Sequence, residues 1–404
     1  MTRREKMLDS IDSAALVAFA RDLVRIPSEN PPGDENGVAM KILDRLKNLG
    51  LKTEIVEAEP GRPNLIASLE GDPGGPTLLF NGHTDVVPAG SGWEVDPYGG
   101  IIKDGRLYGR GACDMKGGLA AILAVAEVFQ KAGIRPRGRL LYSIVVDEET
   151  GGQKGTGYLV ENQILKADMA VVAEPSDFTM SIAEPGIVWV ELVTHGTQTH
   201  TINRKNAINP VEKMAKAIVA FDGLREDLNR LEHDFHGYPI LTVNVIQGGH
   251  KTNIIPDRCR ASVDFRFPPG IGMTPKEAIE RVEATLRALR QEDGEMKIEA
   301  AYKVVAHPFE QSEEIDIVKR VKEATKELSG KYPEWWRRGK KTMIPVDDSD
   351  VYHLWVKGGI PSIYFGPGKL EQAHAANEYI DIEDIPKAAK IYTLIALRVL
   401  TDLK

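Results

Sequence analysis

Cysteine and long apolar runs are both scarce in this sequence. Two cysteines, Cys113 and Cys259, stand far apart in 404 residues. They do not form a disulfide framework, and such sparse use of cysteine fits a reducing compartment. No uninterrupted apolar stretch reaches the roughly 20 residues that a membrane-spanning helix needs. The amino terminus, Met1–Lys6, leads into mixed charge, so a secretory signal is not expected. A soluble, cytoplasmic protein is therefore predicted.

An excess of positive charge is also missing. The formal net charge is −8, which argues against a broad nucleic-acid-binding surface. The sequence has no internal repeat and no low-complexity segment. Apolar residues make up 42% and charged residues 27% of the chain, as in an ordinary globular protein. At 404 residues the chain exceeds the length at which a single core usually stops growing, so two domains are expected.

A histidine follows the first clear core strand. The apolar run at 77–80 stops at Asn81-Gly82 and delivers His83, with Asp85 two residues further on. Ligands of open α/β sheets collect at the carboxyl ends of strands, so this is a favourable place for chemistry. The Asp85 carboxylate is expected to accept the proton on the far ring nitrogen of His83. A single His-x-Asp pair is also a common structural hydrogen bond. Only recurrence of the pattern at other strands would favour a functional site over this alternative.

The pattern does recur at two further strands. The apolar run 140–146 ends in Asp147-Glu148-Glu149, and the run 169–173 ends in Glu174. Three consecutive acids after a core strand are costly unless they are paired, protonated or bound to cations. Asp114 stands just before the apolar helix expected at 119–129, where a simple N-cap is the alternative interpretation. The repetition predicts a shared site built from these side chains.

Hydrophobic periodicity divides the chain into three parts. Residues 1–183 and 303–404 show the alternating helices and strands of an α/β domain. Residues 184–302 instead follow a β-α-β-β-α-β order, which is the ferredoxin-like unit. The expected elements of this inserted domain are strands at 188–194, 240–246, 260–267 and 296–301, with helices at 210–221 and 274–289.

The candidate ligands suit a pair of metal ions. His83, Asp114, Glu149, Glu174 and His374 are the mixture of borderline and hard ligands that zinc, cobalt or manganese accepts. Two ions about 3.5–4 Å apart need a bridging carboxylate. With one carboxylate bridging, each ion gains one histidine and one further acid. Glu148 is then left over as a general base for water.

These motifs together resemble a known family. The segments that carry the resemblance are Gly82-His83-Thr84-Asp85, Cys113-Asp114-Met115-Lys116-Gly117-Gly118, Asp147-Glu148-Glu149-x-Gly151-Gly152, Glu174-Pro175 and Gly366-Pro367-Gly368 with His374-x-x-Asn377-Glu378. In this order, over nearly the whole chain, they resemble the co-catalytic zinc family of acetylornithine deacetylase, succinyl-diaminopimelate desuccinylase, aminoacylase and glutamate carboxypeptidase. The resemblance implies a zinc-peptidase-like α/β catalytic domain with an inserted ferredoxin-like α+β domain that serves as lid and dimer interface.

The resemblance also implies a role for each site residue. His83, Asp114 and Glu174 would hold one ion, and Asp114, Glu149 and His374 the other. Glu148 would be the acid/base, Asp85 would orient His83, and the peptide bond after Asp114 would be cis, which is rare without proline.

In the inserted domain, Asn253 and Arg266 match positions that grip the free carboxylate of the substrate, a task that suits the fork of arginine. His200 matches a lid histidine offered across the dimer to the developing oxyanion. The sequence departs from the family pattern after this histidine, because Thr201–Lys205 runs directly to Asn206-Ala207. A surface histidine is therefore the alternative.

A second departure is Asp347-Asp348-Ser349-Asp350, where glycines are usual before the last aspartate. These acids either favour a basic substrate side chain or face water.

The sequence thus predicts a metal-dependent amidohydrolase that removes an acetyl or succinyl group from an amino acid with a free carboxylate, as in amino-acid biosynthesis. Two divalent ions, zinc above all, and a homodimer are expected. Aminoacylase and carboxypeptidase or dipeptidase activities of the same family are alternatives. A catalytically silent metal or ligand binder is the alternative from another class, and retention of Glu148 counts against it.

Overall fold

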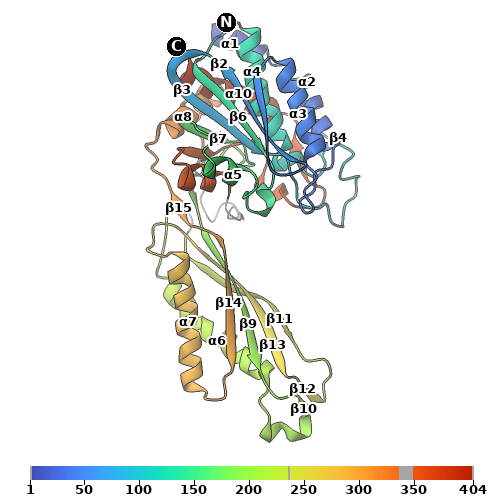
Figure 1. Cartoon of the computed structure of the whole chain (residues 1–404), viewed down its shortest axis with the longest axis vertical. Coiled ribbons are helices and arrows are strands. Elements are labelled where there is room, and N and C mark those ends of the chain that lie inside the picture. Colours follow the sequence, from blue (N-terminus) through green and yellow to red (C-terminus); the bar gives the residue numbers. More distant parts are fainter. Residues whose placement is uncertain (1, 235–236, 336–348, 403–404) are drawn as a thin grey trace. The chain divides into compact units, whose positions relative to one another are not determined.

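The computed structural model describes residues 2–234, 237–335 and 349–402 (Figure 1). Asp347, Asp348 and the basic segment 336–341 lie outside these ranges. The chain forms two compact units: a first unit of residues 1–182 and 311–404, and an inserted unit of residues 183–310. The inserted unit extends past the expected boundary at 302, because β14 (Ile298–Ala306) is followed by β15 (Phe309–Glu310). Strand β15 pairs with β8 (Ala183–Glu184) at the other end of the insertion.

A six-stranded mixed sheet is the centre of the first unit. Its order is β1-β2-β6-β3-β7-β16, with the first two pairings antiparallel and the last three parallel. The strands are β1 (Lys52–Glu59), β2 (Arg62–Glu70), β3 (Asp72–His83), β6 (Arg137–Val145), β7 (Met169–Val172) and β16 (Ser362–Tyr364).

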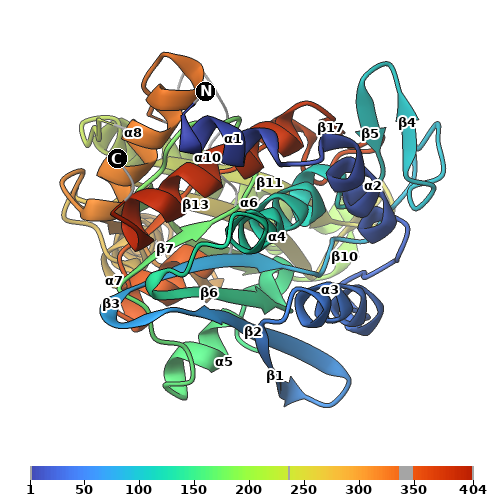
Figure 2. The same cartoon turned by 90° about the horizontal axis from the view of Figure 1, so that it is seen from above.

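Long helices cover this sheet. In Figure 2, α4 (Gly117–Lys131) and α10 (Asp384–Leu400) lie together over one face, and both contact β3. Helix α4 is apolar on nearly all sides and its residues are buried almost throughout, as expected for a helix enclosed by others. The remaining helices of this unit are α1 (Arg3–Asp9), α2 (Ser13–Val24), α3 (Asn36–Asn48), α5 (Thr156–Glu161), α8 (Asp316–Ser329) and α9 (Asp350–Tyr352).

The inserted unit is a four-stranded antiparallel sheet with two helices. The sheet order is β11-β13-β9-β14, formed by β9 (Gly186–His195), β11 (Ile240–Gly248), β13 (Arg258–Phe267) and β14. Helix α6 (Pro210–Leu228) and helix α7 (Pro275–Glu292) pack on it through a separate apolar core. Helix α7 begins with a capping box between Thr274 and Glu277 and a proline in its first turn, which explains its sharp start. The β-α-β-β-α-β order is that of the ferredoxin-like unit.

Short elements complete both units. They are the three-stranded sheet of β17 (Tyr379–Asp381), β5 (Arg106–Tyr108) and β4 (Ile101–Lys103), the ladder of β10 (Thr199–His200) with β12 (Ile254–Ile255), and the helical turns η1 (Ala112–Lys116), η2 (Glu148–Thr150), η3 (Thr201–Asn206), η4 (His353–Lys357) and η5 (Leu370–Gln372). Within the described ranges, no helix is both long enough and apolar enough to cross a bilayer.

The topology explains why the site forms at one edge of the sheet. Strands β6, β3 and β7 are parallel neighbours, so their carboxyl ends reach the same edge. His83 is the last residue of β3, Glu148 follows β6 after two residues, and Glu174 follows β7 after one. Residues separated along the chain by tens of positions therefore come together there.

Candidate metal centre

His83 stands at the centre of the converging side chains. It is almost fully buried, and its Nε2 lies 3.2 Å from Oδ1 of Asp114 and 3.4 Å from Oε1 of Glu174. An oxygen of Glu148 is slightly further away, at 3.9 Å. Two groups have ligand atoms within 4.8 Å of one another: His83 with Glu148 and Glu174, and His83 with Asp114 and Glu149. Carboxylates from three different strand ends and loops thus surround the Nε2 atom of His83.

Asp114 connects this group to the second histidine. Its Oδ1 faces His83, while its Oδ2 lies 3.4 Å from Nε2 of His374. The same His374 nitrogen lies 2.9 Å from Oε2 of Glu149. The two oxygens of Asp114 therefore point toward different imidazoles, which is the arrangement of a carboxylate shared between two ions. The peptide bond between Asp114 and Met115 is cis, as the family resemblance implied.

Asp85 holds the site in a different way from the one expected. The His83 Nδ1 donates to the backbone carbonyl of Asp85 at 2.9 Å, whereas the nearer carboxylate oxygen is 3.5 Å away. The Asp85 carboxylate accepts the backbone N–H groups of Glu148 and Glu149, at 3.2 and 3.1 Å. A side-chain amide hydrogen of Asn30 completes its set of donors at 2.9 Å. Asp85 thus orients His83 through its main chain and the Glu148–Glu149 turn through its side chain.

The density of buried acid fits a divalent cation. Burial and the neighbouring Glu174 carboxylate raise the pKa of Glu148 well above its ordinary value. Burial, together with the charge of Asp114, raises the pKa of Glu174 to about 8. Among the residues that the structure describes, the buried Oε1 of Glu174 has no hydrogen-bond donor. Buried carboxylates with too few donors are stabilised by cations, so the donor set suits bound metal.

The same carboxylates also shift the pKa values of the two histidines. Burial alone would lower the pKa of His83, but the carboxylates of Glu174, Asp114 and Asp85 outweigh it and raise the pKa well above its usual value. Partial burial would likewise lower the pKa of His374, yet contacts with Asp114 and Glu149 raise it to about 11. A bound metal ion would have to displace protons from both rings.

The sequence did not single out the network behind the Glu148–Glu149 turn. Asp147 has a positive φ of 72°, and its carboxylate accepts hydrogen bonds from Nη1 of Arg62 and the backbone N–H of Lys154, both at 3.0 Å. The Nε of Arg62 also donates to Glu35, which is fully buried. No local sequence pattern marks this role, since Arg62 and Asp147 are 85 residues apart.

Two further acidic residues, Glu378 and Asp350, are buried beside the site. Glu378 is fully buried and bonds to Arg110 and to the loop that carries Asp114. Asp350 is also fully buried, so of the two alternatives for this acidic segment it does not face water, while Asp347 and Asp348 lie outside the described residues. Burial raises the pKa of Asp350 to about 6. Cys113 is buried with its Sγ 3.3 Å from the carbonyl of Lys369, which agrees with a packing role.

The inserted unit carries the remaining candidates at two different ends. His200 is exposed, and its strand partner in the β10–β12 ladder is Ile254, the neighbour of Asn253. Arg266 is half-buried near the far end of β13 and donates to Asp264 at 2.8 Å. It lies eight residues beyond Arg258, the first residue of that strand, or about 27 Å at the usual rise of a strand. Within one inserted unit, His200 and Asn253 are therefore neighbours, and Arg266 is remote from both.

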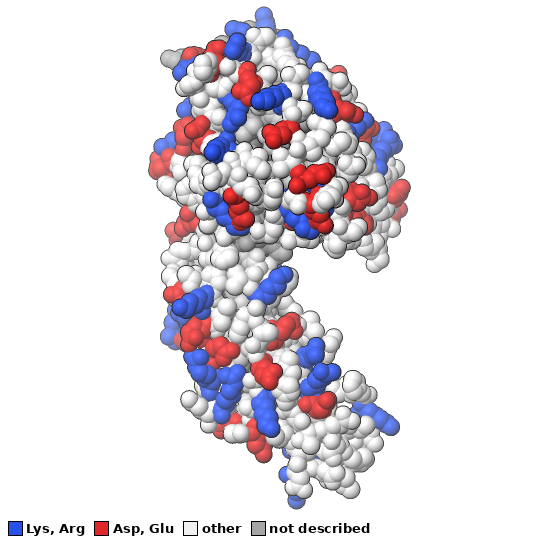
Figure 3. Space-filling view, viewed as in Figure 1, with Lys and Arg blue, Asp and Glu red and all other residues white. Residues whose placement is uncertain are grey.

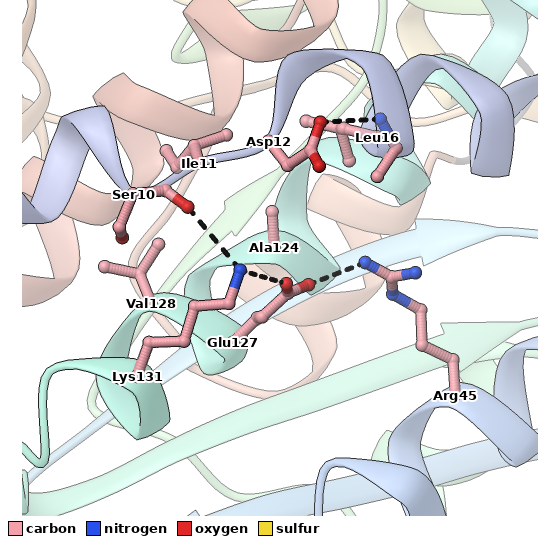
Figure 4. Close-up of a pocket in the computed structure, with 10 residues that line it drawn as sticks. Ser10, Ile11, Asp12, Leu16, Arg45, Ala124, Glu127, Val128 and Lys131 are labelled. Carbon is pink, nitrogen blue, oxygen red and sulfur yellow. Dashed lines mark hydrogen bonds and ion pairs between the residues drawn. The ribbon is translucent and has the colours of Figure 1, made fainter.

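One small cavity of the first unit is lined by residues other than the candidate ligands. The cavity, of about 20 Å³ between α2, α3 and α4, has room for about one water molecule (Figure 4). It is lined by ion pairs from Glu127 to Arg45 and Lys131, at 2.8 and 2.7 Å. We interpret it as a gap between packed helices. Basic and acidic side chains are interspersed on the face drawn in Figure 3, so that face has no broad basic surface.

Comparison with known proteins places this geometry in context. The model for peptidase family M20/M25/M40 matches residues 79–398. Succinyl-diaminopimelate desuccinylase 2 of Ruegeria sp. is 35% identical over 263 residues, a match that spans 62% of this chain and 65% of that protein. Aminopeptidase PepT from Bacillus cereus superposes with a TM-score of 0.77 at 22% identity, covering 96% of this chain and 99% of that one. A dinuclear metal-binding M20 peptidase from Bacillus subtilis has a TM-score of 0.68 at 17% identity, covering 96% and 98%. At these identities the two structural matches show a shared fold.

Proposed function

This chain belongs to peptidase family M20/M25/M40, and from that premise we propose that it removes an acetyl or succinyl group from an N-acyl amino acid with a free carboxylate. The chain is a metal-dependent hydrolase of this family. The observation that carries the proposal is the convergence of two imidazoles on shared carboxylates with one further buried acid, Glu148, beside them. The 35% identity to a desuccinylase supports the choice of an acylated amino acid.

Different residues of the first unit would bind the metal ions and transfer the proton. His83, Asp114 and Glu174 would hold one divalent ion, and Asp114, Glu149 and His374 the second, with zinc the best match and cobalt or manganese also suited. Bound ions would supply Lewis acidity to the scissile carbonyl and acidify a water molecule. Glu148 would take the proton from the attacking water and return it to the leaving amine. Burial and the Glu174 carboxylate raise the pKa of Glu148, which favours a group that can also return a proton as an acid.

The inserted unit would bind the substrate and complete the oxyanion site. Arg266 and Asn253 would hold the free carboxylate, and His200 would donate to the developing oxyanion. The distance between His200 and Arg266 along the inserted sheet supports a homodimer in which the two residues reach one substrate from different copies. The exposure of His200 supports the same arrangement, because a residue offered to a second copy must be accessible.

The direct test is hydrolysis of a substrate panel by protein whose metal content has been measured. The panel contains N-acetyl and N-succinyl amino acids, including basic ones, together with dipeptides and tripeptides. Turnover of acyl amino acids well above that of peptides would support the proposal. Preferential cleavage of peptides would assign the chain to the peptidase branch instead. Absence of turnover on every compound by protein with two bound ions would identify a silent binder.

A further inference from the structure

Glu378 lies where two ligand-bearing segments meet. Strand β17 begins at Tyr379 and pairs with β5, with Tyr379 opposite Tyr108. The loop from Gly109 to Asp114 leaves β5 at this point, so it passes directly beside Glu378. The backbone N–H of Gly109 donates to the carbonyl of Glu378 at 2.9 Å. The last four residues before Glu378 lead back to His374, so Glu378 stands between His374 and the loop that carries Asp114.

The Glu378 carboxylate is saturated with donors from that loop. Its Oε1 accepts the backbone N–H groups of Cys113 and Asp114, at 2.9 and 3.0 Å. Its Oε2 accepts the N–H of Gly111 at 3.1 Å and Nη1 of Arg110 at 2.6 Å. The side chain is fully buried. Charge-assisted bonds of this kind are about twice as strong as neutral ones, and here they fix the main chain immediately before and at Asp114.

Arg110 extends the same contact to the second histidine. Its Nη2 donates to the backbone carbonyl of His374 at 3.3 Å and to that of Ala89 at 3.4 Å. The guanidinium also lies 5.3 Å from the centre of the Trp93 ring, on the loop after β3. Glu378 and Arg110 therefore link the main chain of Asp114 to the main chain of His374, although the two residues are 260 positions apart.

We propose that the buried Glu378–Arg110 pair positions Asp114 and His374 relative to each other, so that an ion can be held between these residues and Glu149. The proposal rests on the ligand assignment of the proposed function. Glu378 and Arg110 act as positioning residues, since their hydrogen bonds go to each other and to main-chain groups. The His83 and Glu174 side of the site depends on the ends of strands β3 and β7, which the central sheet fixes independently. Loss of the pair therefore weakens the ion at His374 more than the ion at His83.

Glu378→Gln is the sharpest variant, because it keeps the shape and replaces one acceptor oxygen by a donor. Whichever way the amide turns, its NH₂ group then faces N–H donors of the loop or of Arg110. The matched control is Glu371→Gln, an exposed glutamate on the same segment. A purely structural role for Glu378 would lower the stability of the metal-free protein but leave the metal affinity of the folded protein unchanged. Metal affinity is therefore the informative measurement.

The experiment is a calorimetric zinc titration of metal-free wild type, Glu378→Gln and Glu371→Gln, with circular dichroism as the check on folding. Wild type and Glu371→Gln are expected to bind two ions. Glu378→Gln is expected to bind the first ion normally and the second about 10–100-fold more weakly, the usual cost of removing a residue that orients a ligand. Two ions bound by folded Glu378→Gln with wild-type affinities would overturn the positioning role.

If Glu378→Gln does not fold, Arg110→Lys decides. It keeps the positive charge opposite Glu378 but cannot also reach the carbonyl of His374 with a second nitrogen. A loss of about tenfold or more in the affinity of the second ion supports the proposal, and wild-type affinity overturns it. Failure of wild type itself to bind two ions would instead contradict the ligand assignment, so the two failures are distinguishable.

Discussion

The two units treat charged side chains in opposite ways. Buried ionisable residues gather in the first unit, where they include Glu35, Arg62, His83, Asp85, Arg110, Asp114, Lys116, Asp147, Glu148, Glu174, Asp350, His353 and Glu378. In the described part of the inserted unit, the only buried acidic or basic side chains are Glu184 and Lys213. Lys213 is paired with Asp293 at 2.7 Å. Both units have a good apolar core, so stability alone does not explain the difference.

Burying a charged side chain costs free energy, and the first unit contains most of the buried charged side chains. A buried carboxylate has to be protonated, hydrogen-bonded or bound to a cation, and the first unit contains carboxylates in all of these situations. The candidate residues of the inserted unit keep ordinary surface surroundings. The first unit thus contains a prearranged cluster of candidate metal ligands, whereas the proposed binding residues of the inserted unit, His200 and Arg266, lie at exposed and half-buried positions.

The largest expected effect concerns the acid/base. Glu148→Gln keeps the size of the side chain but removes its ability to accept a proton, so kcat should fall about 10²–10⁴-fold. The zinc content of the variant should match that of wild type, because Glu148 is not assigned as a ligand. Glu161→Gln, at the exposed last residue of helix α5, serves as control and should leave kcat unchanged. Near wild-type turnover by Glu148→Gln would remove this residue from its role.

Next in size is a stability difference between a buried and an exposed ion pair. Arg62→Met leaves the buried carboxylates of Glu35 and Asp147 without their counter-ion, so unfolding free energy should fall by about 3–5 kcal/mol. Arg287→Met breaks an exposed pair with Glu280 on α7 and should cost less than about 1 kcal/mol. Urea denaturation of metal-free protein measures both. Equal losses for the two variants would refute the contrast between the units.

A smaller effect tests whether the inserted unit acts on a second copy. His200→Ala and Glu148→Gln should each be nearly inactive alone. After unfolding and refolding as an equal mixture, half of the dimers are mixed and each has one intact site, so about a quarter of wild-type activity should return. Size-exclusion chromatography with light scattering confirms that dimers form. If no activity returns in a sample that contains mixed dimers, His200 does not act across the interface.

The smallest signal is the proton release that accompanies metal binding. In metal-free protein the pKa of His374 is raised to about 11 and that of Glu174 to about 8, so both carry protons at pH 7. Ligands must be deprotonated to bind zinc, and raising the pH removes this competition. Zinc addition should therefore release protons, and apparent zinc affinity should increase from pH 6 to pH 8. Titration in two buffers of different ionisation enthalpy measures the release, and an affinity that decreases with pH would contradict it.

Much of this architecture is visible in the sequence because buried parallel strands are continuous apolar runs. The runs at 77–80, 140–146 and 169–173 became β3, β6 and β7, and the polar residues after them meet at one edge. Strand β1 was not expected, because it is an edge strand in which charged residues alternate with few apolar ones.

What the sequence could not show is the set of long-range polar contacts. Arg62 bonds to residues 27 and 85 positions away, and Arg110 to one 268 positions away. No local pattern distinguishes such an arginine from an exposed one, because only the folded chain decides which charges become buried. The Asp85 carbonyl, closer to His83 than the carboxylate, is another such case, since the backbone path after β3 sets that geometry.

The central claim is that side chains of the first unit hold two divalent ions around Asp114. Crystals of zinc-loaded protein, with anomalous scattering measured at the zinc edge, test it most directly. Two peaks about 3.5–4 Å apart are expected, one beside Nε2 of His83 and one beside Nε2 of His374, with Asp114 between them. Zinc peaks located away from Asp114, or none in fully loaded crystals, would contradict the account.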